Sequence, residues 1–289
     1  MTRAVVGIGF GLAVSILPVA APVAAPLTAQ GHGPVYGLST PTLGRGGWSL
    51  DVAGMGRFFD GGQTAMLRPM LSYGVTEDLQ LSASLPLPVA RDDDAPAVRA
   101  FIRMPASQDA EIMVGWRVQR RGTGVGTRQE TTLWFAVDVP TDARRDGLET
   151  APGLFGSVVT GYASRAVYVW LGGAYRRSLS AGSDQHRAGD VTMGSLVVGY
   201  RPPSFRADYP HPDWRMFVEV VGERVGRDSV GGIRRSDSGG RQLYVALTLL
   251  GLYGSWGLAG GPAFPLYQSL NGNQRDDGVR LAVNASFWF

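Results

Sequence analysis

The last stretch of the chain, from Gly278 to Phe289, alternates apolar and more polar residues and ends on an aromatic side chain. Successive side chains of a β-strand point to opposite faces, so this alternation predicts a strand with one apolar face. The apolar set is Val279, Leu281, Val283, Ala285, Phe287 and Phe289, and the opposite set is Arg280, Ala282, Asn284, Ser286 and Trp288.

Similar alternation recurs along the chain between turn signals, and it predicts an all-β fold of about twelve strands. No long stretch shows an apolar period of about 3.6 residues with helix caps, so we expect little helix. The uncharged face of each strand suits a hydrocarbon layer, which a tilted strand crosses in about 9–11 residues. The expected strands are Trp48–Phe59, Thr64–Val75, Leu79–Leu87, Asp109–Gln119, Glu130–Pro140, Leu154–Ala163, Ala166–Arg176, Asp190–Arg201, Asp213–Arg224, Arg241–Gly251, Tyr253–Ala263 and Gly278–Phe289.

The links between these strands alternate in length. Tight links (Val75–Leu79, Ala163–Ala166, Gly251–Tyr253) are separated by longer polar ones: Pro88–Gln108, Thr141–Gly153, Arg177–Gly189, Val225–Gly240 and Pro265–Asp277. Short turns on one side and long loops on the other are typical of a transmembrane β-barrel. Two links, Arg120–Gln129 and Pro202–Pro212, are longer than this pattern expects.

These patterns predict a closed antiparallel transmembrane β-barrel. In lipid every backbone N–H and C=O must be paired internally, and an open sheet would leave two bare edges. The first strand near Trp48 is therefore expected to pair with the last strand near Phe289. We expect interfacial girdles from aromatic residues near strand ends: Trp48, Tyr73, Tyr162, Tyr168, Tyr200, Trp214, Tyr253 and Trp288.

Charged residues within the strands fall on the face opposite the apolar one. A charge facing lipid would cost about 2–4 kcal/mol near the bilayer midplane, so we expect these residues to face the lumen. They would form either a constriction that selects solutes or a structural network of ion pairs. The candidates are Asp51, Arg57, Arg68, Glu111, Arg117, Asp138, Arg215, Glu219, Glu223 and Arg280.

The amino end has the layout of a secretion signal: Arg3, then an uncharged apolar run, then small residues near Ala25 and Ala29. We therefore expect a signal peptide over residues 1–29, a periplasmic lead over 30–47 and the barrel over 48–289. The chain has no Cys, which excludes disulfides and thiolate metal sites. Its mean hydropathy is near zero, as expected where only alternate residues meet lipid. Arginine pairs beside turns, such as Arg234 and Arg235, suit solvent or anionic lipid headgroups better than nucleic acid.

An enzyme on a barrel would need a nucleophile with a base in reach. The chain has three histidines, His32, His186 and His211, and none lies on an expected strand beside a suitable serine. His186 with Asp184 or Asp190 is the least unsuitable pair. Cleavage after Ala29 would create a terminal Gln-Gly-His, a Cu(II)-binding arrangement. We nevertheless expect no catalytic residues, no metal and no cofactor.

The terminal Phe289, with Phe287 two residues before it, resembles the assembly signal of outer-membrane β-barrels, which the barrel-assembly machinery recognises. Two further stretches, His32–Val52 and Arg68–Pro86, contain the motifs GWSL and YGVTEDLQL. They are similar to the opening of the meta-pathway phenol-degradation transporter-like family of outer-membrane proteins. The resemblance implies a channel or transporter for small, often apolar or aromatic solutes, and it supplies no functional residues.

The expected function is therefore passage of small solutes across the outer membrane, with membrane lipid and the barrel-assembly machinery as partners. The alternatives are a structural barrel with a plugged lumen and an outer-membrane enzyme.

Overall fold

A computed structural model describes residues 33–59, 62–91, 110–139, 152–179, 187–206 and 211–289. The regular secondary structure of the described residues is β-strand apart from one short 3₁₀ helix, and no helix in these ranges is long and apolar enough to span a membrane. The strands are β1 (Trp48–Phe59), β2 (Gly62–Gly74), β3 (Leu79–Ser84), β4 (Leu87–Arg91), β5 (Ala110–Gly124), β6 (Thr127–Val139), β7 (Gly153–Ala163), β8 (Val167–Ser178), β9 (Val191–Tyr200), β10 (Asp213–Val225), β11 (Ser229–Val230), β12 (Ile233–Arg234), β13 (Gly240–Tyr253), β14 (Trp256–Leu270) and β15 (Asp277–Trp288), with a short 3₁₀ helix at Pro203–Phe205.

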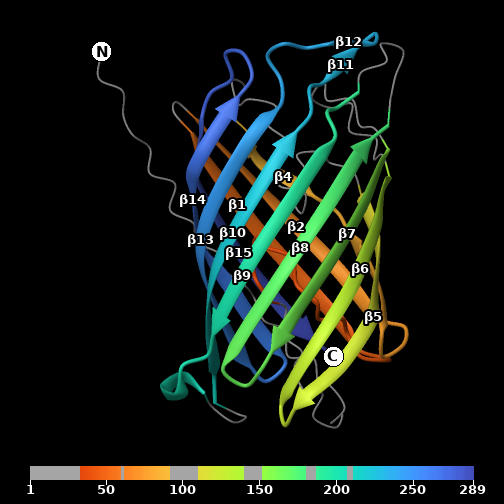
Figure 1. The fold of residues 1–289 in the computed structure, drawn as a ribbon, viewed down its shortest axis with the longest axis vertical. Helices are drawn as coiled ribbons and strands as arrows, with labels where there is room; N and C mark the ends of the chain where they lie inside the picture. Colours follow the sequence, from red (N-terminus) through yellow and green to blue (C-terminus); the bar gives the residue numbers. More distant parts are fainter. Residues whose placement is uncertain (1–32, 60–61, 92–109, 140–151, 180–186, 207–210) are drawn as a thin grey trace.

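The strands form one closed antiparallel barrel (Figure 1). β3 and β4 both pair with β2 and together make one wall strand, interrupted at Leu85 and Pro86. β11 and β12 form a separate small hairpin. The wall therefore has twelve strands, as the alternation predicted.

The barrel closes between its first and last strands. β1 pairs with β2 on one side and with β15 on the other, where Leu50 lies opposite Phe287. The backbone pairing continues to the end of the chain, because the N–H of Trp48 donates to the carbonyl of Phe289 at 3.0 Å. Closure removes the sheet edges that lipid could not satisfy.

The two ends of the barrel differ. The lower rim carries Phe289 and the tight turns, and the upper rim carries β11 and β12 (Figure 1). The Arg120–Gln129 link, expected to be loose, is tight because β5 and β6 extend to within two residues of each other. Gly126 completes this turn at φ 70°, a conformation that favours glycine. The Pro202–Pro212 link begins with the 3₁₀ helix, and residues 207–210 lie outside the described ranges.

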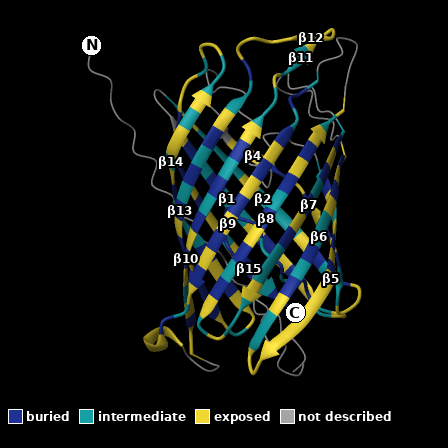
Figure 2. Ribbon diagram, viewed as in Figure 1, coloured by how far each residue is buried: buried dark blue, intermediate teal, exposed yellow. Residues whose placement is uncertain are grey.

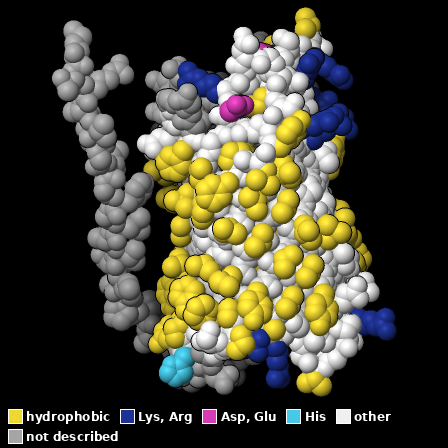
Figure 3. All heavy atoms as spheres, turned by 60° about the vertical axis from the view of Figure 1, so that its left-hand side comes forward, with side chains coloured by type: hydrophobic (Ala, Val, Ile, Leu, Met, Phe, Trp, Pro, Cys, Tyr) yellow, Lys and Arg dark blue, Asp and Glu magenta, His cyan; other side chains and the backbone are white. Residues whose placement is uncertain are grey.

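Exposed and buried residues alternate along the wall strands (Figure 2). Most of the exposed set is apolar, and every wall strand contributes to it. On the face shown in Figure 3 these side chains form a broad belt. β15 shows the rule clearly, since Leu281 and Val283 are exposed while Arg280 and Ala282 are buried. The wall thus places its apolar face outward and its polar face inward.

Two of the eight expected girdle residues are placed differently. Tyr168 and Trp288 are buried on the inner face, whereas Trp48, Tyr162, Tyr200, Trp214 and Tyr253 are exposed and Tyr73 is half-exposed. The prediction was wrong for these two because it used nearness to a strand end and ignored which face each residue occupies.

Candidate functional site: the barrel lumen

The ten charged residues expected to face the lumen all lie on the inner face of the wall. Eight are buried, and Arg68 and Arg215 are half-buried. Their role in selecting solutes stays a prediction, but their contacts describe the lumen in detail.

One group of ion pairs lies in the upper half of the lumen and joins four strands. Arg176 on β8 contacts Glu111 on β5 and Asp138 on β6, each at 2.5 Å. Arg68 on β2 contacts the other oxygen of Glu111. Residues on non-neighbouring strands meet here, so their side chains reach across the lumen.

A second group lies near the upper end of β15. Asp277 accepts from Arg57 Nε at 3.2 Å, from the hydroxyl of Tyr244 at 2.8 Å and from Arg280. Arg280 also lies 4.0 Å from the centre of the Tyr244 ring, and it is fully buried. A buried charge of this kind is stable only because opposite charges and hydrogen bonds surround it.

A third group lies near the lower rim. Arg117 contacts Glu130 at 3.0 Å and Asp78 at 2.9 Å. Arg215 contacts Asp213 at 3.1 Å, and Asp213 also accepts from Arg201 at 2.5 Å. These pairs place positive and negative charges side by side around the lower opening.

Asp51 accepts hydrogen bonds from polar side chains on the two strands that close the barrel. Ser49 donates to it at 2.5 Å, Asn284 at 3.3 Å, and Ser286 also donates. These partners stand on β1 and β15, so Asp51 ties the closing seam of the barrel.

Sequence reasoning missed six members of these groups of ion pairs: Asp78, Glu130, Arg176, Arg201, Asp213 and Asp277. All six lie at or next to an end of an expected strand, where the assignment of faces stops. On β8 the side chains of Trp170 and Ala174 face inward, and continuing the same alternation places Arg176 on the inner face too. The signal for Arg176 was therefore present in the sequence.

The residues from Gly33 to Gly47, here called the lumen segment, lie inside the barrel up to Leu43, and Arg45 and Gly46 are exposed. Leu43 N–H donates to Gln80 on β3 at 2.8 Å, and Leu38 N–H donates to Ser195 on β9 at 3.1 Å. The hydroxyl of Tyr36 donates to the carbonyl of Gly261 on β14 at 2.7 Å. A segment that touches strands around the whole circumference must occupy the lumen.

Glu219 on β10 holds the top of this segment. Its carboxylate accepts the backbone N–H groups of Val35 at 2.9 Å, Tyr36 at 2.8 Å and Gly37 at 2.6 Å. Thr248 donates to the same carboxylate at 2.5 Å. A fully buried carboxylate needs such donors, since leaving it without them would be costly.

The same carboxylate affects the Tyr36 hydroxyl. Burial, aided by the negative charge of Glu219, raises the pKa of Tyr36 well above its usual range. The phenol therefore stays neutral and can donate its hydrogen bond.

The lower part of the lumen segment is held by Thr40. Its hydroxyl donates to Glu130 at 3.2 Å and accepts from the indole N–H of Trp170 at 3.0 Å, and its carbonyl accepts from Thr132 at 2.6 Å. Residues 33–43 of the lead expected over residues 30–47 thus lie inside the barrel, where the wall binds several of their backbone N–H groups. The division of the chain into signal peptide, lead and barrel stays a prediction.

One side of the lumen is apolar. Tyr168, Trp170 and Phe217, here called the aromatic strip, have ring centres 5.6 to 6.2 Å apart. Leu38 of the lumen segment is buried with them in one apolar cluster. A hollow of ≈ 620 Å³ at the lower rim is lined by the aromatic strip together with arginines that include Arg201 and Arg215.

Other expected sites fall outside the described residues. These are the signal peptide, the terminal Gln-Gly-His, and His186 with Asp184. His211 is described and is exposed beside β10. Within the described ranges no group of His, Asp and Glu side chains is arranged to hold a metal.

Comparisons with known proteins agree with the barrel fold. The COG4313 outer membrane channel from Pseudomonas putida F1 is similar with a TM-score of 0.65 and 14% identity, over 88% of this chain and 100% of that one. The NanC porin is similar with a TM-score of 0.50 and 12% identity, over 82% of this chain and 98% of that one. No family model and no curated protein sequence matches the chain. The structure therefore shares the fold of outer-membrane channels, and membership of the phenol-pathway transporter family stays a prediction.

Proposed function

We propose that the protein is an outer-membrane channel for small solutes that carry an apolar or aromatic part. The observation that carries this proposal is the aromatic strip, which lines a lumen that also holds groups of ion pairs. Apolar walls with a few convergent polar groups are typical of small-molecule sites. The likeness to outer-membrane channels supports the same class of function and an outer-membrane location.

The lumen segment acts as the movable constriction of this channel. Its polar contacts are hydrogen bonds to wall residues, such as those of Glu219 and Thr132, rather than strand pairing over its whole length. Leu38 and Trp170 belong to the same buried apolar cluster, so withdrawal of the segment would uncover the aromatic strip to a solute.

A pair of glycine substitutions tests the constriction without changing the wall. A Cβ on Gly37 would meet Val197 at 2.3 Å, whereas a Cβ on Gly44 would meet only Glu77 at 3.8 Å. We expect Gly37→Ala to displace the segment and raise single-channel conductance in planar bilayers. Gly44→Ala, the matched control, should behave as the parent chain.

Solute passage is tested by swelling of liposomes that contain the folded protein. Neutral aromatic solutes such as phenol should enter faster with Gly37→Ala than with Gly44→Ala. Equal conductance and equal swelling for both variants and the parent chain would contradict a movable constriction.

A structural barrel with a plugged lumen is the second candidate. It is favoured by the complete burial of Glu219 and Arg280, which leaves these charges no contact with water. If no variant with a displaced segment conducts ions or passes solutes, this second function replaces the first.

A further inference from the structure

Two arginines stand opposite each other on the outer face of the wall at the upper rim. Arg224 on β10 pairs directly with Arg241 on β13, and both are exposed on the side that faces away from the lumen. Like charges directly opposite across a sheet are destabilising. The described part of the chain places no carboxylate within ion-pair distance of either guanidinium.

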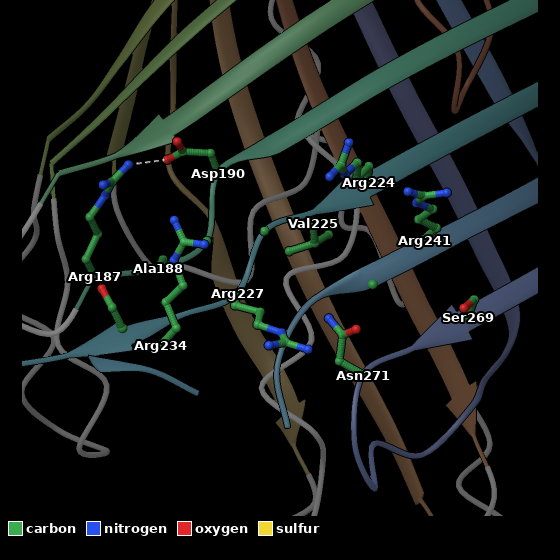
Figure 4. Close-up of a pocket in the computed structure, with 14 residues that line it drawn as sticks. Arg187, Ala188, Asp190, Arg224, Val225, Arg227, Arg234, Arg241, Ser269 and Asn271 are labelled. Carbon is green, nitrogen blue, oxygen red and sulfur yellow. Dashed lines mark hydrogen bonds and ion pairs between the residues drawn. The ribbon is translucent and has the colours of Figure 1, made fainter. Parts of the chain in front are cut away.

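More basic residues surround this arginine pair. A hollow of ≈ 610 Å³ is lined by both arginines, by Arg187, Arg227 and Arg234, and by the polar Ser269 and Asn271 (Figure 4). Its single acidic lining residue, Asp190, is held by Arg187 at 2.7 Å and by the Tyr175 hydroxyl at 2.7 Å. The site therefore has a strong excess of positive charge that its own acid does not neutralise.

Three glycines form a row on the outer face just below Arg224. They occupy the next outward-facing positions of their strands toward the middle of the apolar belt. Gly173, Gly194 and Gly222 are paired neighbours on β8, β9 and β10. A Cβ on Gly194 would meet nothing within 4 Å, so the wall is hollowed here. Neighbouring strands are about 4.8 Å apart, so three strands that lack side chains at this level leave a strip of surface about 10 Å wide. An acyl chain fits in a strip of that width.

The next row of outward-facing residues, closer to the middle of the belt, is apolar. Leu171 and Leu196 are paired neighbours with 60% and 43% of their surface exposed. The arginine pair thus stands at the edge of the apolar belt. The shallow depression lies below Arg224 on β10, and Leu243, the next outward residue below Arg241 on β13, bounds it on one side. Figure 3 shows basic side chains above the apolar belt as well as below it.

We propose that this surface binds one phosphorylated glycolipid of the outer leaflet, an inference that rests on the proposed outer-membrane location. In such barrels the short turns face the periplasm, so the upper rim, opposite the tight turns, faces outward. Arg224 and Arg241 hold a phosphate, for which the planar guanidinium is well suited. One acyl chain lies along the glycine row. A free phosphate would use the arginines but would gain nothing from the depression below them, so the lipid is the occupant that both features fit.

The test uses the folded full chain in detergent, titrated with diphosphorylated lipid A and followed by native mass spectrometry. The double substitution Arg224→Gln with Arg241→Gln should weaken binding about tenfold or more. Arg120→Gln with Arg121→Gln at the lower rim is the matched control and should bind as the parent chain. Binding by the first double variant equal to that of the parent chain would overturn the proposal.

Gly194→Leu tests the depression separately. Leucine has space there and fills the groove, so lipid A binding should fall while the arginine pair stays intact. Gly54→Leu, on the outer face of β1 away from the site, is the control. Folding of every variant is checked by heat-modifiable gel migration.

Three further ligands separate the possible sources of the anion. Lipid A stripped of phosphate and phosphatidylethanolamine should bind weakly. Inorganic phosphate that competes fully with lipid A, together with lipid A binding unaffected by Gly194→Leu, would show a free-anion site and overturn the lipid proposal. Conductance in phosphatidylcholine bilayers tests the channel independently, because those bilayers contain no phosphorylated glycolipid.

Discussion

The carboxylate of Glu219 accepts the backbone N–H of Tyr36 at 2.8 Å, and the two residues are 183 positions apart in the sequence. This contact joins the middle of β10 to a segment that precedes the first strand. It makes the lumen a two-part structure, a rigid wall and a chain segment that the wall holds by side-chain hydrogen bonds.

Glu219→Gln should loosen the lumen segment. Glutamine removes the negative charge and replaces one accepting oxygen with an NH₂ group, which would face backbone N–H donors. The hydrogen bonds weakened or lost are bonds to a charged group, which contribute about 1.5–3 kcal/mol each. We expect larger and noisier single-channel conductance than in the parent chain. Asp237→Asn, which removes an exposed carboxylate at the upper rim, should leave the recordings unchanged. If both variants changed the conductance in the same way, the cause would be the loss of a negative charge in general and not the loosened segment.

Arg280→Ala should both destabilise the barrel and change its ion selectivity. It leaves Asp277 and Glu223 buried with less positive charge nearby, and breaking a buried ion pair by removing one partner costs about 3–5 kcal/mol. The temperature of heat-modifiable unfolding should fall, and reversal potentials in a KCl gradient should shift toward cation preference. An unshifted reversal potential would place Arg280 off the ion path.

Arg117→Ala tests the lower end of the lumen. It removes one of the two arginines that pair with Glu130, the other being Arg128 at 3.2 Å. Glu130 also accepts from Thr40 of the lumen segment, so the variant should alter conductance as well as cation preference. Planar-bilayer recordings unchanged by both Arg117→Ala and Arg280→Ala would remove these residues from any gate.

The raised pKa of Tyr36 predicts a loss of stability in alkali. Burial and the charge of Glu219 favour the neutral phenol in the folded chain, so its contribution is complete below the ordinary tyrosine pKa of about 10. As pH rises above that value the unfolded chain ionises first and the contribution declines. The difference in unfolding free energy between the parent chain and Tyr36→Phe should therefore shrink above about pH 10. A difference constant up to pH 11 would contradict the burial of this hydroxyl.

Removal of Phe289 should reduce the amount of folded barrel in the membrane. Its ring stacks with Trp48 at 6.3 Å and with Phe287 at 5.6 Å, and its backbone pairs with Trp48 across the closing seam. The proposed assembly signal and the seam are both lost, so heat-modifiable protein in outer-membrane fractions should decrease. Val125→Ala, at an exposed turn, is the control and should assemble normally.

The sequence by itself determined the wall of this protein. Alternation assigned each strand an outer apolar face, and the cost of a charge in lipid then required residues such as Glu111 and Arg280 to point inward. Strand period is a local property, and it can be read without knowing which strands are neighbours in space. Residues at strand ends, such as Arg176 and Asp277, were missed because a local pattern becomes weak where a strand begins or ends.

Only the tertiary structure decided which inward groups meet and what fills the space between them. Arg57 and Asp277 are 220 positions apart, and closure of the barrel brings them together. The lumen segment has no periodic pattern to mark it, since its main donors are backbone N–H groups that every residue except proline carries. Its partner, Glu219, is determined by the shape of the closed lumen, and that shape exists only after the first and last strands have paired.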